Sequence, residues 1–185
     1  MGDGFLILHG IDNLRPPEHW HHWLAERLRG RGFATSYPAL PEPFDPRPKH
    51  WGAAVLSSLS ELPPSPVVVC HSLSCLLWIR MAAAGDLPPC ERVLLVSPPH
   101  DDRLPANGTS FAVGDLDPSA IEEAPRVVCG TEDDYAPGGP PGWAAEIGAD
   151  IDMLAGVGHI NPDDGHGPWP SVERWCLDPD VRLTP

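Results

Sequence analysis

The stretch VVVCHSLSCLL (residues 67–77) joins a strand pattern to a helix pattern through a single serine. Its β-branched start is typical of a buried strand, and the apolar residues after Ser72 predict a buried helix over 73–84. A sharp turn between a strand and a helix exposes a nucleophilic serine, and such a turn usually reads Gly-x-Ser-x-Gly. Cys70 and Ser74 stand at the two glycine positions here. Both side chains are small, so the turn is sterically tolerable, and Ser72 is a candidate nucleophile.

Short apolar runs and helix-period segments alternate on both sides of this stretch. The expected strands are 4–10, 33–38, 66–70, 92–98, 124–130 and 149–156, and the expected helices are 16–32, 49–61, 73–84 and 167–177. The strands are rich in Val and Leu and do not alternate between apolar and polar residues, although 149–156 is less clean, and this indicates a sheet covered on both faces. We therefore expect one domain over residues 1–185, an α/β three-layer α/β/α sandwich around a mostly parallel six-stranded sheet with strand order 2-1-3-4-5-6.

Polar residues follow the carboxyl ends of four of these strands, where chemistry collects in such sheets. The first strand ends in His9-Gly10, the third is followed by Ser72, the fifth by residues 131–134 (TEDD) and the sixth by His159. A serine hydroxyl needs a base to remove its proton, imidazole is such a base near neutral pH, and a carboxylate orients the imidazole. The chain order serine, acid, histidine fits this use, so we expect a catalytic triad of Ser72, Asp133 and His159.

Two positions of this triad have competitors. Asp133 follows its strand by three residues and is preferred, with Asp134 and then Glu132 as alternatives. His159 is preferred to His166 because it directly follows the sixth strand.

Backbone N–H groups beside the serine would stabilise the charge that develops on a substrate carbonyl. The N–H of Leu73 is the first expected donor of this oxyanion hole. The second is the N–H of Ile11, with that of Asp12 next in order.

Several residues, Asp12 among them, are expected to lie near the pocket. His9 and His71 flank the two turns and are interpreted chiefly as packing or hydrogen-bonding residues, with contact to substrate as the alternative. The segment 99–123 is too short for a lid domain and is expected to lie beside the pocket. Its two expected wall residues are Phe111 and Leu116.

A cluster of histidines, His19, His21 and His22, raises the possibility of a metal-dependent hydrolase. On a continuous helix His19 and His22 share a face and His21 points away, and a zinc site needs a further close ligand. We therefore expect no metal and no cofactor.

The net charge is −14, which argues against binding to nucleic acid or to an anionic membrane surface. No apolar run is long enough to span a membrane, and no signal peptide is expected at the N-terminus. The five cysteines form no CxxC pair and are interpreted as buried thiols of a cytoplasmic protein.

Four segments together resemble the retinoblastoma-binding-protein-nine-like serine hydrolases of the α/β-hydrolase superfamily. The segments are 6–24, 67–77, 127–137 and 156–170, and they cover about half of the chain in the family's order. The resemblance implies a minimally capped sheet, no metal, the triad named above and hydrolysis of a small acyl substrate. Ser74 departs from the glycine usual in that family.

The expected function is cleavage of a small carboxylic ester, amide or thioester through an acyl-enzyme on Ser72. A catalytically silent binding protein on the same scaffold is the alternative.

Overall fold

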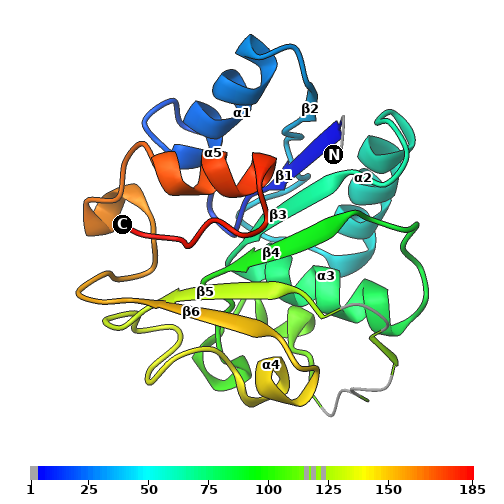
Figure 1. The fold of residues 1–185 in the computed structure, drawn as a ribbon. Helices are drawn as coiled ribbons and strands as arrows, with labels where there is room; N and C mark the ends of the chain where they lie inside the picture. The colour runs from blue at the N-terminus through cyan, green and yellow to red at the C-terminus, as the bar shows by residue number, and fades with distance from the viewer. Residues whose placement is uncertain (1–3, 115–116, 118–119, 122–123) are drawn as a thin grey trace.

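The sheet of the computed structural model has six strands, all parallel, in the order β2-β1-β3-β4-β5-β6. The structure describes residues 4–114, 117, 120–121 and 124–185. The strands are β1 (Gly4–Leu8), β2 (Ala34–Ser36), β3 (Val67–His71), β4 (Arg92–Val96), β5 (Arg126–Gly130) and β6 (Asp150–Leu154). The predicted fold class and strand order are therefore confirmed (Figure 1).

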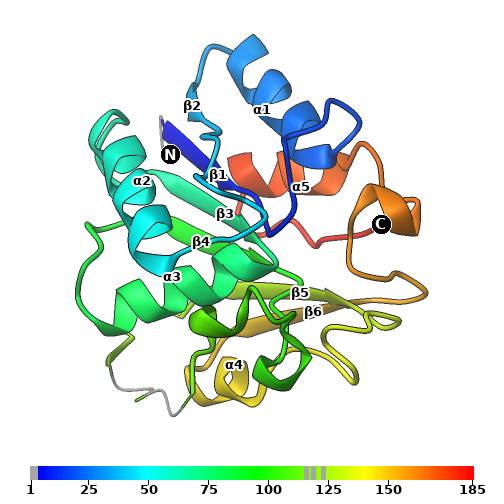
Figure 2. The same cartoon turned by 180° about the vertical axis from the view of Figure 1, so that it is seen from behind.

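Helices cover both faces of the sheet (Figures 1 and 2). Helices α1 (Trp20–Gly30) and α5 (Pro170–Leu177) lie on one face, and α2 (Pro48–Ser60) and α3 (Leu73–Ala83) lie on the other. Alternate residues of each strand enter opposite cores: Leu6 and Val68 pack with the α2–α3 layer, whereas Ile7 packs with the α1–α5 layer. Two buried cores explain why the central strands β1 and β3 are buried at every position, whereas the edge strand β6 carries Asp150 and Asp152.

Some predicted boundaries and orientations differ from the structure. The first helix begins at Trp20 rather than near residue 16, because the His19 side chain accepts a bond from the His21 N–H and caps the helix there. The apolar spacing of the predicted helix 49–61 places Leu56 on the inward face with Trp51, Val55 and Leu59, but Leu56 is 39% exposed. A short helix, α4 (Gly142–Glu146), precedes β6 and was not predicted.

Within residues 97–114, the segment after β4 forms 3-10 turns at Asp101–Arg103 and Thr109–Phe111. Leu116, one of the expected pocket residues, lies outside the described residues. In the part of the chain that is described, no helix combines the length and the apolar character needed to cross a membrane.

Candidate active site

The turn between β3 and α3 holds Ser72 in a conformation that L-residues rarely adopt. Ser72 has φ 56° and ψ −123°, and its N–H donates to the carbonyl of Val96 at 2.8 Å. Such strain persists only where the surroundings impose it, and it places the side chain at the carboxyl edge of the sheet. The turn requires a residue without a side chain at position 10, since a Cβ on Gly10 would lie 2.8 Å from the Ser72 Cβ.

Ser74 stabilises this turn rather than disturbing it. The side chain is completely buried, and its Oγ accepts a bond from the His71 N–H at 3.0 Å. The same hydroxyl lies 2.9 Å from the carbonyl of His71 and 3.2 Å from that of Leu8, either of which can accept its proton. The hydroxyl therefore ties the start of α3 to the ends of β1 and β3, a role that glycine cannot fill.

We expect the Ser74→Ala substitution to lower the free energy of unfolding by about 1–3 kcal/mol, because it leaves a buried N–H without an acceptor. Urea denaturation measures this loss. Ser57→Ala, at an exposed position of α2, is the matched control and should leave the midpoint unchanged. Equal stability of the two variants would show that the Ser74 hydroxyl does not stabilise the turn.

Three polar side chains from separate loops meet above the sheet edge. The Oγ of Ser72 lies 2.8 Å from Nε2 of His159, and Nδ1 of His159 lies 2.9 and 3.0 Å from the two carboxylate oxygens of Asp133. All three side chains are buried. The carboxylate accepts the Nδ1 proton, so Nε2 presents its lone pair to the serine hydroxyl. This arrangement can withdraw a proton from Ser72.

The loop that carries His159 is held by close backbone contacts. The His159 N–H donates to the Asp164 carboxylate at 2.6 Å. Gly158 packs against the same carboxylate, because a Cβ on Gly158 would lie only 2.6 Å from Cγ of Asp164. A Cβ on Gly130 would lie 2.0 Å from the carbonyl oxygen of Val157. The two glycines allow the loop to pack onto the end of β5.

The competing residues do not reach the site. Asp134 and Glu132 are exposed to solvent, whereas Asp133 is buried. The ring of His166 packs edge-on against Trp169, and the backbone N–H of His166 donates to the carbonyl of Asn161. Burial lowers the pKa of His166 from its usual value.

A cavity of about 530 Å³ opens beside Ser72. The segment 99–105 contributes Pro99, Leu104 and Pro105 to its lining, as expected of a segment beside the pocket. The other lining residues are Gly10, Ile11, Asp12, Asn13, Leu14, Pro16, Glu18, His19, His71, Ser72, Leu73, Tyr135, His159, Asn161, Pro162 and Asp163.

The prediction that Phe111 forms a pocket wall is wrong. Phe111 is fully buried and packs edge-on against Trp51 in the core, with ring centroids 5.1 Å apart. Its ring belongs to the core that contains residues of α2 and α3, and Phe111 is not among the residues that line the cavity. Sequence reasoning also missed Tyr135, whose ring lies 4.7 Å from that of His159.

The family model for serine hydrolases, described as "Serine hydrolase", matches residues 5–177. The chain belongs to the serine hydrolase family. The expected relationship to a family of serine hydrolases is thus confirmed. No curated protein matches the chain closely enough to be counted as a relative.

Solved structures share the fold of this serine hydrolase at low sequence identity. The ydeN gene product of B. subtilis superposes with a TM-score of 0.78 at 22% identity, covering 94% of this chain and 96% of that chain. A YdeN-like protein from Pectobacterium atrosepticum gives 0.72 at 21% identity, with 94% and 89% covered. A monoacylglycerol lipase from Paleococcus ferrophilus gives 0.64 at 16% identity, with 94% and 93% covered.

His9 of this serine hydrolase is buried and does not line the cavity, so it does not form part of the pocket wall. Its Nδ1 lies 2.7 Å from the Gly10 carbonyl, and its Nε2 accepts a bond from the Leu40 N–H at 3.0 Å. Both ring nitrogens are therefore satisfied, and burial lowers the pKa of His9 to about 4. The neutral ring anchors the loop after β1, which agrees with its interpretation as a packing residue.

The histidines near the start of α1 differ from the helical-wheel expectation. His19 lies before the helix as its cap, so the geometry of a continuous helix does not apply to it. Its ring stacks on that of His21, with centroids 3.9 Å apart, and His21 rather than His22 is buried beside it. The ring of His71 lies 5.0 Å from that of His21.

Proposed function

We propose that this protein is a serine hydrolase that cleaves small carboxylic esters through an acyl-enzyme on Ser72. The hydrogen-bonded chain from Ser72 through His159 to Asp133 carries this proposal. In it, Ser72 is the nucleophile, His159 is the general base and Asp133 orients the imidazole.

The first half of the proposed reaction acylates the serine. His159 Nε2 takes the Ser72 proton while Oγ attacks the substrate carbonyl, and the resulting imidazolium protonates the leaving alcohol. The N–H groups of Leu73 and Ile11 would hold the oxyanion. Both residues line the cavity, and among the described residues neither N–H has a hydrogen-bond acceptor. Asp12 is unsuited to this role because its N–H already donates to the carbonyl of Pro43 at 2.9 Å.

The second half releases the acid. A water molecule, deprotonated by His159, attacks the acyl carbonyl, and Ser72 leaves with the proton from the imidazolium. The cavity volume of about 530 Å³ suits a small acyl group, and its walls combine apolar side chains such as Leu73 and Leu104 with polar ones. Amides and thioesters offer the same carbonyl chemistry. Cys70, Cys75, Cys129 and Cys176 are free thiols, which supports a cytoplasmic location.

A fluorophosphonate probe tests the nucleophile. We expect covalent labelling of the wild-type protein at Ser72, and complete loss of labelling in Ser72→Ala, because the probe bonds to an activated serine Oγ. Mass spectrometry of the labelled peptide and hydrolysis of a panel of p-nitrophenyl esters provide the measurements. Ser97→Ala is a control at another buried serine. Labelling that persists in Ser72→Ala would refute the assignment, and labelling without turnover of any ester would favour a binding protein on this scaffold.

A further inference from the structure

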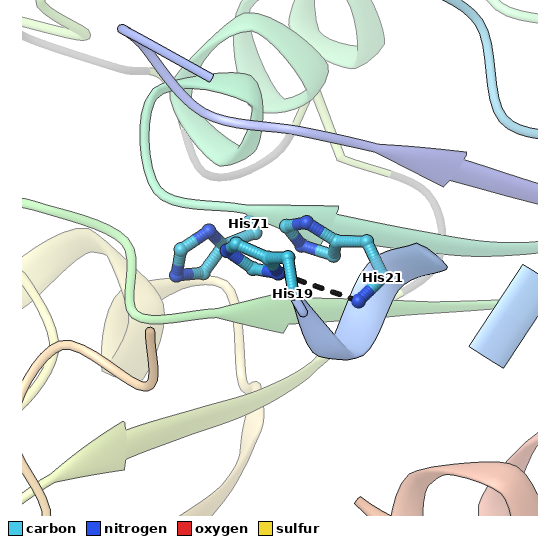
Figure 3. A group of neighbouring side chains, drawn as sticks. All are labelled: His19, His21 and His71. Carbon is cyan, nitrogen blue, oxygen red and sulfur yellow. Dashed lines mark hydrogen bonds between the residues drawn. The ribbon is translucent and has the colours of Figure 1, made fainter. Parts of the chain in front are cut away.

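Three imidazole rings gather in the interior next to the candidate active site. His19 and His21 come from the start of α1 and His71 from the end of β3 (Figure 3). All three side chains are buried, at 4%, 0% and 4% exposure respectively. One ring nitrogen from each lies within 4.8 Å of the corresponding nitrogen of the others. No other group of three such side chains meets this condition among the described residues.

Several ring nitrogens of this histidine cluster have no hydrogen-bond partner among the described residues. Neither Nδ1 nor Nε2 of His21 has a hydrogen-bond partner among the described residues, although both are buried. His71 Nε2 lies 2.9 Å from the carbonyl of His159 and donates to it, so the lone pair of the unpartnered Nδ1 is free. His9, equally buried, has both nitrogens satisfied. The cluster therefore contains buried ring nitrogens without hydrogen-bond partners, which are rare in the core of a folded protein.

We propose that His19, His21 and His71 bind one transition-metal ion of the Zn²⁺ class through their ring nitrogens. Neutral imidazole is a preferred ligand of Zn²⁺, Co²⁺, Ni²⁺ and Cu²⁺, and three histidines are a sufficient protein ligand set. Burial lowers the pKa of all three rings, so each is neutral with a lone pair at neutral pH. His19 and His71 also line the cavity, which leaves a fourth coordination position for water or a small ligand.

Binding requires one local movement. In a tetrahedral zinc site neighbouring ligand nitrogens are about 3.3 Å apart, and two stacked rings cannot both point at one ion. His71 is held by its bond to His159, whereas the His19 side chain is held by a 3.3 Å bond to the His21 N–H and by stacking. His19 is therefore the ring that turns.

Charge near the cluster favours a cation. Three neutral ligands leave the ion's charge uncompensated, and the same cavity is lined by the carboxylates of Asp12, Glu18 and Asp163. No Lys or Arg is found among the described residues that line it. The bond from His71 to the His159 carbonyl connects the proposed metal site directly to the loop that carries His159.

The test measures metal binding without any enzyme assay. Protein treated with EDTA is titrated with Co²⁺, read by its visible ligand-field absorption, and with Zn²⁺ by calorimetry, in excess Mg²⁺ to occupy surface carboxylates. We expect one ion per chain with a Kd in the micromolar range or tighter. His21→Gln and His19→Asn should each weaken binding by at least about 100-fold, since each removes one of three ligands. Asn retains a helix N-cap at position 19, so this variant keeps the fold.

His22→Gln, next to the cluster in sequence but only half-buried, is the matched control and should bind like wild type. Circular dichroism of the metal-free proteins establishes that each variant is folded. The proposal is overturned if wild type binds neither ion under these conditions, or if folded His21→Gln and His19→Asn bind as tightly as His22→Gln. Because the readout is binding, its failure leaves the proposed hydrolase function untouched, and loss of Ser72 labelling leaves the metal site untouched.

Discussion

Replacing Asp133 with asparagine should lower kcat for ester hydrolysis roughly 10⁴-fold, with little change in KM. The carboxylate accepts the Nδ1 proton of His159 at 2.9 Å, and this bond leaves Nε2 unprotonated toward Ser72. An asparagine amide can donate to Nδ1 and stabilise the wrong tautomer, in which Nε2 carries the proton. Steady-state kinetics with the best p-nitrophenyl ester measure the effect.

Asp134→Asn is the matched control, one residue away and exposed. It should retain wild-type kinetics because its side chain faces solvent. Asp133→Asn should also remain folded, since the amide oxygen can still accept the bond that the Tyr135 N–H gives to Oδ1. A large kcat loss in Asp134→Asn, with Asp133→Asn nearly as active as wild type, would reverse the assignment of the acid.

Replacing Gly130 with alanine should cost roughly 3 kcal/mol of unfolding free energy and about 100-fold in kcat. The added Cβ would lie 2.0 Å from the Val157 carbonyl oxygen and 2.2 Å from that of Gly158. These are backbone atoms, so the loop after β6 must move away from β5, and His159 moves with it. Urea denaturation and ester hydrolysis measure the two losses.

Gly142→Ala controls for glycine replacement as such. Gly142 begins α4, and a Cβ there meets no atom within 4 Å. We expect unchanged activity and unchanged or slightly higher stability. If Gly130→Ala matched this control, the close approach of the two loops would not determine the position of His159.

The strand order could be predicted because local composition and chain geometry both constrain it. The runs at 66–70 and 93–96 are apolar at every position, which requires cover on both faces, and parallel strands require helical crossovers. The same reasoning placed the polar residues at one edge. The same reasoning was wrong for the burial of Leu56. The apolar face of a helix shows which side faces the core, but it does not show how far the neighbouring layer extends to cover that side.

The site was predictable as a set of loops but not as a set of contacts. Ser72, Asp133 and His159 each follow a strand end, so their proximity follows from the parallel sheet. Phe111 was misplaced because a loop without periodicity gives no indication of side-chain direction. Nothing in the local sequence of Ser74 predicts that its hydroxyl bonds to both neighbouring strand ends.

The sequence by itself determined the layers, the strand order and the edge at which the polar residues gather, because hydrophobic periodicity and connection length act along the chain. The tertiary structure alone decided that the Asp133 carboxylate faces His159 and that the hydroxyl of Ser74 stabilises a turn where glycine is usual. It also decided which histidines lie together in the interior. His19 and His71 are far apart in the sequence, and a cap that shifts the start of α1 brings their rings within 5.6 Å. Such contacts depend on side-chain directions in space, which only the packed fold fixes.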